Sequence, residues 1–117
     1  MIVKIGTDIV DVTRIEKAMM RPRFLKRILT INEQKQNLTP QRVAGRWAAK
    51  ESVAKALGIH LKWHDVEVMN SEDGTPMVSF ADPSLLPANH TLHLSISHEQ
   101  GYATAVVILE KHITQAC

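Results

Sequence analysis

A carboxylate and an ammonium group stand four residues apart in a segment with the pattern of a helix, residues 46–58 (RWAAKESVAKALG). At about 100° per residue, Glu51 points between two groups of apolar residues, and Lys55 follows one turn later beside Ala48. Charges flanked by small apolar side chains are costly to remove from water unless they have partners, and a metal ion and a phosphate are suitable partners. An ordinary ion pair on a solvated helix face is the commonest alternative for this spacing.

A second carboxylate, Asp8, lies in the apolar segment 2–12 (IVKIGTDIVDV), whose β-branched residues predict a strand. Strand alternation places Gly6, Asp8 and Val10 on one face. Gly6 permits a close approach of another segment or an unusual backbone geometry. The alternative for Asp8 is a residue that forms a turn or a bulge.

The elements that must position these side chains follow from capping and turn signals. A long helix is expected to begin at Thr39 as N-cap with Pro40 in the first turn, and to end near Gly58. The other expected elements are short helices at 13–20 and 24–29, a hairpin of 66–69 with 76–80, and strands at 91–97 and 102–109. A long helix with antiparallel hairpins predicts an α+β fold.

Composition sets broad limits on the function. The chain of 117 residues is 44% hydrophobic and 22% charged, which predicts one globular domain over residues 1–117. A net charge of +2 is too small to indicate nucleic-acid binding, although it suits an acidic partner. Cys117 is the only cysteine, so neither an internal disulfide nor a cysteine metal site is expected. The absence of a signal peptide or a long apolar run predicts a cytoplasmic protein without a membrane partner.

Two motifs occur in a characteristic order. The first is Gly6-x-Asp8-Ile9-Val10 followed by Arg14-Ile15, and the second is the whole of residues 46–58. Further matches are Asp73-Gly74-x-Pro76, Leu94-Ser95-Ile96-Ser97-His98 and Tyr102-Ala103-x-Ala105-x-Val107. Together they resemble the holo-acyl-carrier-protein synthases, the small bacterial type of 4′-phosphopantetheinyl transferase, over nearly the whole chain.

The resemblance implies a fold and an activity. The expected fold is a long helix packed on a curved, mainly antiparallel sheet. The expected reaction transfers the 4′-phosphopantetheine group of coenzyme A to a serine of an apo acyl carrier protein and releases 3′,5′-ADP. The resemblance also implies a homotrimer with active sites at the subunit interfaces. No nucleophile is needed from this chain.

The same resemblance assigns the central residues. Asp8 and Glu51 match the metal-binding carboxylates of the family, and Mg²⁺ is the expected cofactor because it prefers oxygen ligands and binds phosphates. Lys55 matches the lysine that contacts the phosphate and stabilises its developing charge. Glu51 is also a candidate for holding or deprotonating a water that accepts the serine proton.

Other positions have two interpretations each. Arg46 and Lys50 are candidates for contacts with coenzyme A phosphates, against ion pairing on a helix flank. Gly58 allows a close ligand approach, or only caps the helix. Pro76 matches a position that borders the adenine, although a hairpin turn explains it equally well. His98 is a candidate for the 3′-phosphate or the ribose, against a solvated histidine at a strand end.

A basic strip is expected to face the acidic carrier protein. Arg14 matches a basic residue of the family with this role. Lys17 and Arg21 follow at spacings of three and four, which predicts that all three lie on one helical face. The alternative for Arg14 is an exposed arginine at the start of a helix.

Two other functions use the same residues. A different Mg²⁺-dependent enzyme, such as a hydrolase acting on a nucleotide or pyrophosphate, would release product from coenzyme A without a protein acceptor. A non-enzymatic binding module would have Glu51 and Lys55 only as an ion pair, and would show no Mg²⁺-dependent binding of coenzyme A.

Overall fold

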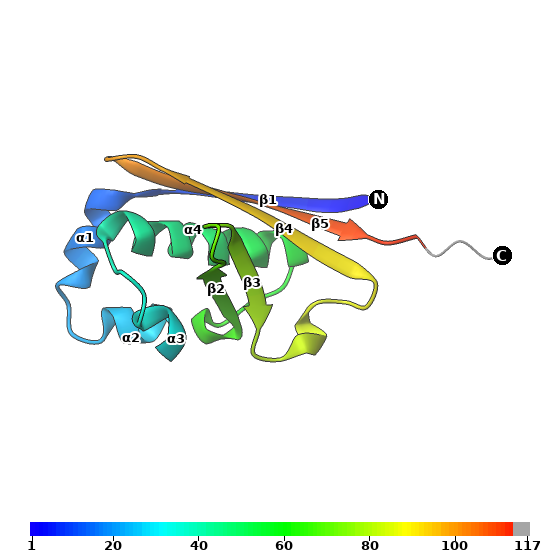
Figure 1. Cartoon of the computed structure of the whole chain (residues 1–117), viewed down its shortest axis with the longest axis horizontal. Coiled ribbons are helices and arrows are strands. Elements are labelled where there is room, and N and C mark those ends of the chain that lie inside the picture. Colours follow the sequence, from blue (N-terminus) through cyan, green and yellow to red (C-terminus); the bar gives the residue numbers. More distant parts are fainter. Residues whose placement is uncertain (114–117) are drawn as a thin grey trace.

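The computed structural model describes residues 1–113 and has a three-stranded antiparallel sheet lying along a long helix (Figure 1). The sheet order is β1–β5–β4, formed by Ile2–Asp11, Tyr102–Lys111 and His90–His98, and the long helix is α4, Pro40–Leu57. The other elements are α1 (Val12–Met19), α2 (Phe24–Ile28), α3 (Ile31–Gln34), a hairpin of β2 (Val66–Asn70) and β3 (Pro76–Phe80), and the short 3-10 helices η1 (Trp63–Asp65) and η2 (Pro83–Leu85). The predicted α+β class is confirmed. Cys117, the only cysteine of the sequence, lies outside the described residues.

Helix α4 is enclosed on most sides. The sheet covers one side of it, and the β2–β3 hairpin and α1 contact other sides (Figure 1). Its buried positions therefore include residues in every direction around the axis: Val43, Ala44, Gly45, Arg46, Ala48, Ala49, Lys50, Ser52, Val53 and Ala56. This enclosure explains why the charges of the segment do not gather on one polar face. No helix within residues 1–113 has the length and apolar composition needed to cross a bilayer.

The two ends of α4 are capped as the sequence predicts. The Thr39 side chain accepts a hydrogen bond from the Arg42 backbone N–H at 3.2 Å, and Pro40 occupies the first turn. At the other end Gly58 has φ +68°, a left-handed conformation that glycine adopts without strain.

Strand β1 crosses α4 closely at Gly6. A Cβ atom added there would lie 2.0 Å from the Ser52 carbonyl oxygen and 2.9 Å from the Ala56 backbone nitrogen. Only glycine fits this contact, which confirms the close approach expected from the sequence. Facing α4, β5 presents small residues such as Ala103 and Ala105, which are fully buried.

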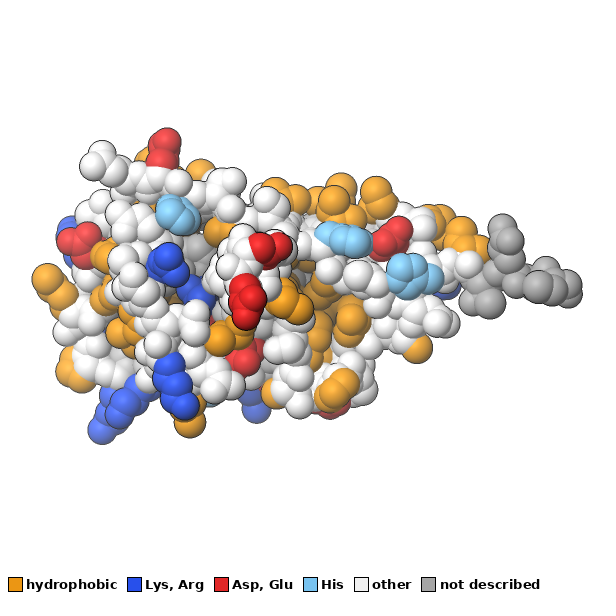
Figure 2. Space-filling view, viewed as in Figure 1, with side chains coloured by type: hydrophobic (Ala, Val, Ile, Leu, Met, Phe, Trp, Pro, Cys, Tyr) orange, Lys and Arg blue, Asp and Glu red, His pale blue; other side chains and the backbone are white. Residues whose placement is uncertain are grey.

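The opposite face of the sheet is exposed, and its β1 and β5 part is largely apolar, whereas β4 contributes polar residues. Alternation along β1 directs Ile5 and Ile9 away from α4, and they are 62% and 64% exposed. Val106 lies opposite Thr7 in the register and is also exposed. Figure 2 shows hydrophobic side chains along the upper edge of the molecule, where the sheet lies in Figure 1.

The short helices differ in detail from the expectations. Helix α1 starts at Val12 because the Asp11 side chain caps it, and it ends at Met19. Arg21 therefore lies beyond the helix, and the prediction that it shares a helical face with Arg14 is wrong. Helix α3 was not expected, since four residues are too few to show a periodic pattern.

Candidate active site

Lys55 and Asp8 lie in contact where the end of α4 meets β1. The Lys55 ammonium donates to the Thr7 carbonyl oxygen at 2.9 Å and lies 3.4 Å from Asp8 Oδ1. The Asp8 side chain is 19% exposed and that of Lys55 is 54% exposed. Lys55 therefore pairs with a carboxylate on the strand, which argues against a simple pair with Glu51 one turn earlier.

Glu51 lies level with Asp8. The strand and the helix run in opposite directions, because Lys4 lies next to Gly58 while Gly6 contacts Ser52 and Ala56. Two strand residues advance about 6.6 Å, which equals about four helix residues. Asp8 therefore lies at about the same height along α4 as the turn that carries Glu51. Glu51 is half-buried, and among the described residues its carboxylate takes no hydrogen bond or ion pair.

The oxygen atoms of Asp8 and Glu51 suit a hard divalent cation whose remaining ligands come from a substrate. Asp8 and Glu51 supply carboxylate oxygens, and the Lys55 ammonium beside Asp8 marks a position where a positive charge is favourable. Within residues 1–113 no group of three His, Cys, Asp or Glu side chains is arranged to hold a metal. Mg²⁺ commonly takes only one or two carboxylates and completes its shell with phosphate and water. The residues present thus suit a metal that arrives with a phosphate ligand.

A pocket of about 580 Å³ opens beside the first half of α4. It lies between α4, the β2–β3 hairpin and the end of β4. Its lining residues are Thr39, Gln41, Arg42, Gly45, Arg46, Val68, Asn70, Gly74, Pro76, Ile96, His98 and Glu99. The structure thus brings together three residues that the sequence singled out, namely Arg46, Pro76 and His98.

Arg46 is held against the wall of this pocket. Its side chain donates from Nε to the Val68 carbonyl at 3.1 Å and from Nη2 to Asn70 Oδ1 at 3.3 Å. Burial lowers the pKa of Arg46, and the nearby Glu33 carboxylate acts in the opposite direction. A guanidinium has five N–H donors, so two anchored donors leave others for a ligand. The pocket therefore has a fixed cation at its wall.

The pocket and the carboxylates project from different sides of α4. Arg46 and Glu51 are five residues apart, which places their directions about 140° apart around the helix. Neither Asp8, Glu51 nor Lys55 lines the pocket. Each chain therefore presents two separate half-sites, one acidic with a lysine and one basic and concave.

The chain is similar to known proteins along most of its length. The family described as the 4′-phosphopantetheinyl transferase superfamily matches residues 4–107. The chain belongs to this superfamily. The holo-[acyl-carrier-protein] synthase of Anoxybacillus flavithermus is 46% identical over 95% of this chain and 98% of its own length. The holo-[acyl-carrier-protein] synthase of Halalkalibacterium halodurans is 43% identical over 95% of this chain and 98% of its own length.

Solved structures of such synthases have the same fold. The holo-(acyl-carrier-protein) synthase from Bacillus anthracis, crystallised in complex with CoA (3′,5′-ADP), is similar with a TM-score of 0.82 and 38% identity, over 96% of this chain and 99% of that chain. The holo-[acyl-carrier-protein] synthase from Neisseria meningitidis is similar with a TM-score of 0.83 and 30% identity. The similarity covers 95% of this chain and 100% of that chain. The resemblance carried by the two sequence motifs is thus confirmed at the level of the family.

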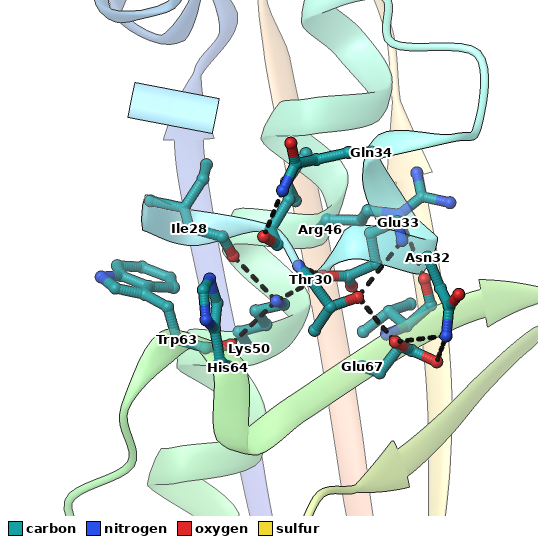
Figure 3. A network of polar contacts seen from close by, with 12 residues as sticks. Ile28, Thr30, Asn32, Glu33, Gln34, Arg46, Lys50, Trp63, His64 and Glu67 are labelled. Atoms are coloured by element: carbon teal, nitrogen blue, oxygen red, sulfur yellow. Dashed lines mark hydrogen bonds and ion pairs between the residues drawn. The ribbon is translucent and has the colours of Figure 1, made fainter. Parts of the chain in front are cut away.

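Within this transferase fold, Lys50 does not reach a ligand. Its ammonium donates to Glu33 Oε1 at 2.6 Å, to the Ile28 carbonyl at 2.8 Å and to the Trp63 carbonyl at 2.9 Å (Figure 3). Burial lowers the pKa of Lys50, and the bond and charge of Glu33 oppose this shift. All three donors are used inside the protein, so the interpretation of Lys50 as a phosphate contact is wrong.

Gly58, Arg14 and Lys17 have simple structural positions in the transferase. Gly58 caps α4 and is absent from the lining of the pocket. Arg14 and Lys17 lie on the exposed side of α1, since its buried residues are Val12, Ile15 and Ala18. Figure 2 shows several basic side chains over the part of the molecule formed by α1–α3.

Sequence reasoning missed Glu33. This carboxylate is fully buried and accepts from Lys50 and from the Thr30 and Val68 backbone N–H groups. The pattern Thr30-x-x-Glu33 is a capping box, and this signal could have located the start of α3.

Proposed function

We propose that this chain is a holo-acyl-carrier-protein synthase that transfers 4′-phosphopantetheine from coenzyme A to a serine of an apo acyl carrier protein, releasing 3′,5′-ADP. The observation that carries the proposal is the Lys55–Asp8 contact level with Glu51, in a chain that matches the family from residue 4 to residue 107. A similar protein was crystallised in complex with CoA (3′,5′-ADP), which supports coenzyme A as the donor here.

The acidic half-site suits phosphoryl transfer. The serine oxygen forms a bond to the phosphorus that carries pantetheine, the pyrophosphate P–O bond breaks, and 3′,5′-ADP leaves with the bridging oxygen. Such reactions depend on positioning and on stabilising charge. When bound by Asp8 and Glu51, Mg²⁺ would neutralise the pyrophosphate oxygens. Lys55 is exposed enough to turn from Asp8 to the phosphate and stabilise its charge. Glu51 remains the candidate for accepting the serine proton through a water.

The basic half-site suits the nucleotide. Its volume of about 580 Å³ lies within the usual range of small-molecule pockets. In this proposal Arg46 and the neighbouring Arg42 would supply positive charge for the phosphates, and Pro76 would give the adenine an apolar contact. His98, which also lines the pocket, would contact the 3′-phosphate or the ribose.

A homotrimer would join the two half-sites. One chain holds the carboxylates and the pocket on different sides of α4, so a ligand that touches both is best served by two neighbouring chains. The exposed apolar face of the sheet, with Ile5, Ile9 and Val106, supports an interface there. We therefore propose a cyclic homotrimer with active sites between subunits. A cytoplasmic location stays a prediction.

The carrier protein is assigned to the basic surface of α1. Arg14 and Lys17 project into solvent close to the end of β1, the strand that carries Asp8. Arg21 follows the helix and is exposed, and we propose that it adds to this basic surface, although it does not share the helical face of Arg14. An acidic partner would be attracted and oriented by these charges.

The test is the intact mass of an apo acyl carrier protein after incubation with this protein, coenzyme A and Mg²⁺. We expect a mass increase of one phosphopantetheine group together with release of 3′,5′-ADP. Release of a nucleotide with an unmodified carrier protein would indicate a hydrolase. No reaction and no Mg²⁺-dependent binding of coenzyme A would indicate a binding module.

A further inference from the structure

A buried cluster of three charges stands behind the nucleotide pocket. Arg46 and Lys50 are one turn apart on α4 and are 3% and 4% exposed, while Glu33 on α3 is 0% exposed. Two cations therefore share one fully buried carboxylate. Such an arrangement is costly unless each group is held by hydrogen bonds. Every buried polar side chain among the described residues has a partner.

Glu33 is connected to Arg46 through one backbone residue. Glu33 Oε2 accepts from the Val68 N–H at 2.8 Å, and the Val68 carbonyl accepts from Arg46 Nε at 3.1 Å. The N–H and C=O of a strand residue point to the same side, and Val68 directs both away from β3 toward α4. The free edge of β2 is thus held between a carboxylate and a guanidinium (Figure 3).

Glu33 also neutralises Lys50. Glu33 Oε1 accepts from Lys50 at 2.6 Å and from the Thr30 N–H at 2.8 Å. With Lys50 paired in this way, the charge of Arg46 is the buried positive charge that remains for a ligand at the pocket wall. Lys50 itself does not line the pocket.

We propose that Glu33 is a positioning residue for the nucleotide pocket, acting through Val68 to fix the guanidinium of Arg46 while it pairs with Lys50. The proposal rests on the proposed function, in which this pocket receives the 3′,5′-ADP part of coenzyme A. Glu33 itself is absent from the pocket lining, so its effect on binding must be indirect.

The experiment is isothermal titration of 3′,5′-ADP and coenzyme A into Glu33→Gln, combined with transfer kinetics. We expect affinity for 3′,5′-ADP to fall about 10- to 100-fold, by analogy with the loss of the hydrogen-bond partners that orient metal ligands. The KM for coenzyme A should rise while the KM for the carrier protein is unchanged. Glu67→Gln is the matched control, since Glu67 accepts from Thr30 Oγ1 in the same network but touches neither Lys50 nor the Val68 N–H.

A double-mutant cycle separates positioning from a general structural role. In an Arg46→Met background, adding Glu33→Gln should change 3′,5′-ADP affinity less than about twofold, because the two residues act as one unit. Equal losses in both backgrounds would overturn the proposal, and so would a Glu33→Gln protein with normal affinity.

A second variant covers the event that Glu33→Gln does not fold. Glu33→Asp keeps the charge but shortens the side chain, so it should retain the ion pair and still weaken 3′,5′-ADP binding. If both variants are unfolded, Glu33 serves the fold alone and the proposal fails. If the unaltered protein binds no 3′,5′-ADP, the proposed function fails first.

Discussion

The Asp8 carboxylate is paired with Lys55, and a metal ion bound at Asp8 would compete with Lys55 for this carboxylate. Its side chain is mostly buried and faces α4, and the Lys55 ammonium 3.4 Å away partly balances its charge. A divalent ion between Asp8 and Glu51 would release Lys55, which is the more exposed partner. The same lysine would then be free to contact a phosphate. In this proposal the ion pair and the metal-bound site would be two states of one cluster.

We predict that Asp8→Ala and Glu51→Gln each lower transfer by about two orders of magnitude or more, because charge stabilisation dominates this chemistry. Kinetics across Mg²⁺ concentrations, with circular dichroism to show an intact fold, provide the measurement. Asp11→Asn is the control, since Asp11 is on the opposite face of β1 and asparagine also caps helices. Near-normal activity of either site variant at low Mg²⁺ would reject the metal assignment.

At the scale of elements, the contact between β1 and α4 sets the geometry of the acidic half-site. Gly6 is one repeat before Asp8 on the same face, and its lack of a Cβ lets the strand lie against Ser52. Any side chain at this position would push Asp8 away from α4.

Gly6→Ala should destabilise the protein by about 3 kcal/mol or more, since the added methyl group would meet backbone atoms that cannot move aside. Urea unfolding of the two proteins measures the difference. Gly101→Ala is the matched change, because nothing lies within 4 Å of the added Cβ there. Similar effects of the two substitutions would contradict the packing argument.

The surface of α1 carries the second prediction at this scale. Arg14→Glu should raise the KM for the carrier protein about tenfold and leave the KM for coenzyme A unchanged, because the charge meets an acidic partner and not the nucleotide. High salt should partly reproduce the loss in the unaltered enzyme. Lys111→Glu, at the far end of the sheet, is the control. A weaker affinity for coenzyme A alone would place Arg14 in the nucleotide site.

The elements were largely predictable from local signals. Thr39-Pro40 and Gly58 predicted the ends of α4. The residue pattern located the three long strands and the face of Asp8, and the turn signal at Gly74 located the β2–β3 hairpin. The buried pair of Glu33 and Lys50 was not predictable, since its partners are 17 residues apart and nothing in the sequence tells which charges are enclosed. For the same reason the sequence left Lys50 with two interpretations, a phosphate contact or an ion pair, and the structure shows the ion pair with Glu33. Arg21 was misplaced because helix ends are less certain than helix centres.

At the scale of the whole molecule, we expect the exposed apolar side chains of β1 and β5 to be covered by another subunit. The side chains of Ile5 and Ile9 on β1 are more than half exposed to solvent, and clustered exposed apolar residues commonly mark an interaction surface. A cyclic trimer would cover this face and bring the pocket of one chain toward the carboxylates of the next.

We expect light scattering to give a trimer for the unaltered protein and monomers for Ile5→Asp, because a charge would be buried at the interface. Met77→Asp should remain trimeric, since Met77 is equally exposed, at 59%, but lies on the β2–β3 hairpin. A stable and active monomer of the unaltered chain would reject the assembly.

The central claim is that the two half-sites on different chains form one active site. The most direct measurement is the mass of the apo carrier protein after reaction with a co-expressed mixture of Glu51→Gln and Arg46→Met subunits. Each variant alone should give almost no modified carrier protein. The mixture should regain up to about a quarter of the unaltered rate, since random assembly pairs an intact pocket with intact carboxylates at one interface in four. A mixed trimer that stays as inactive as its parents, although an unaltered trimer modifies the carrier protein, would show that the site lies within one chain.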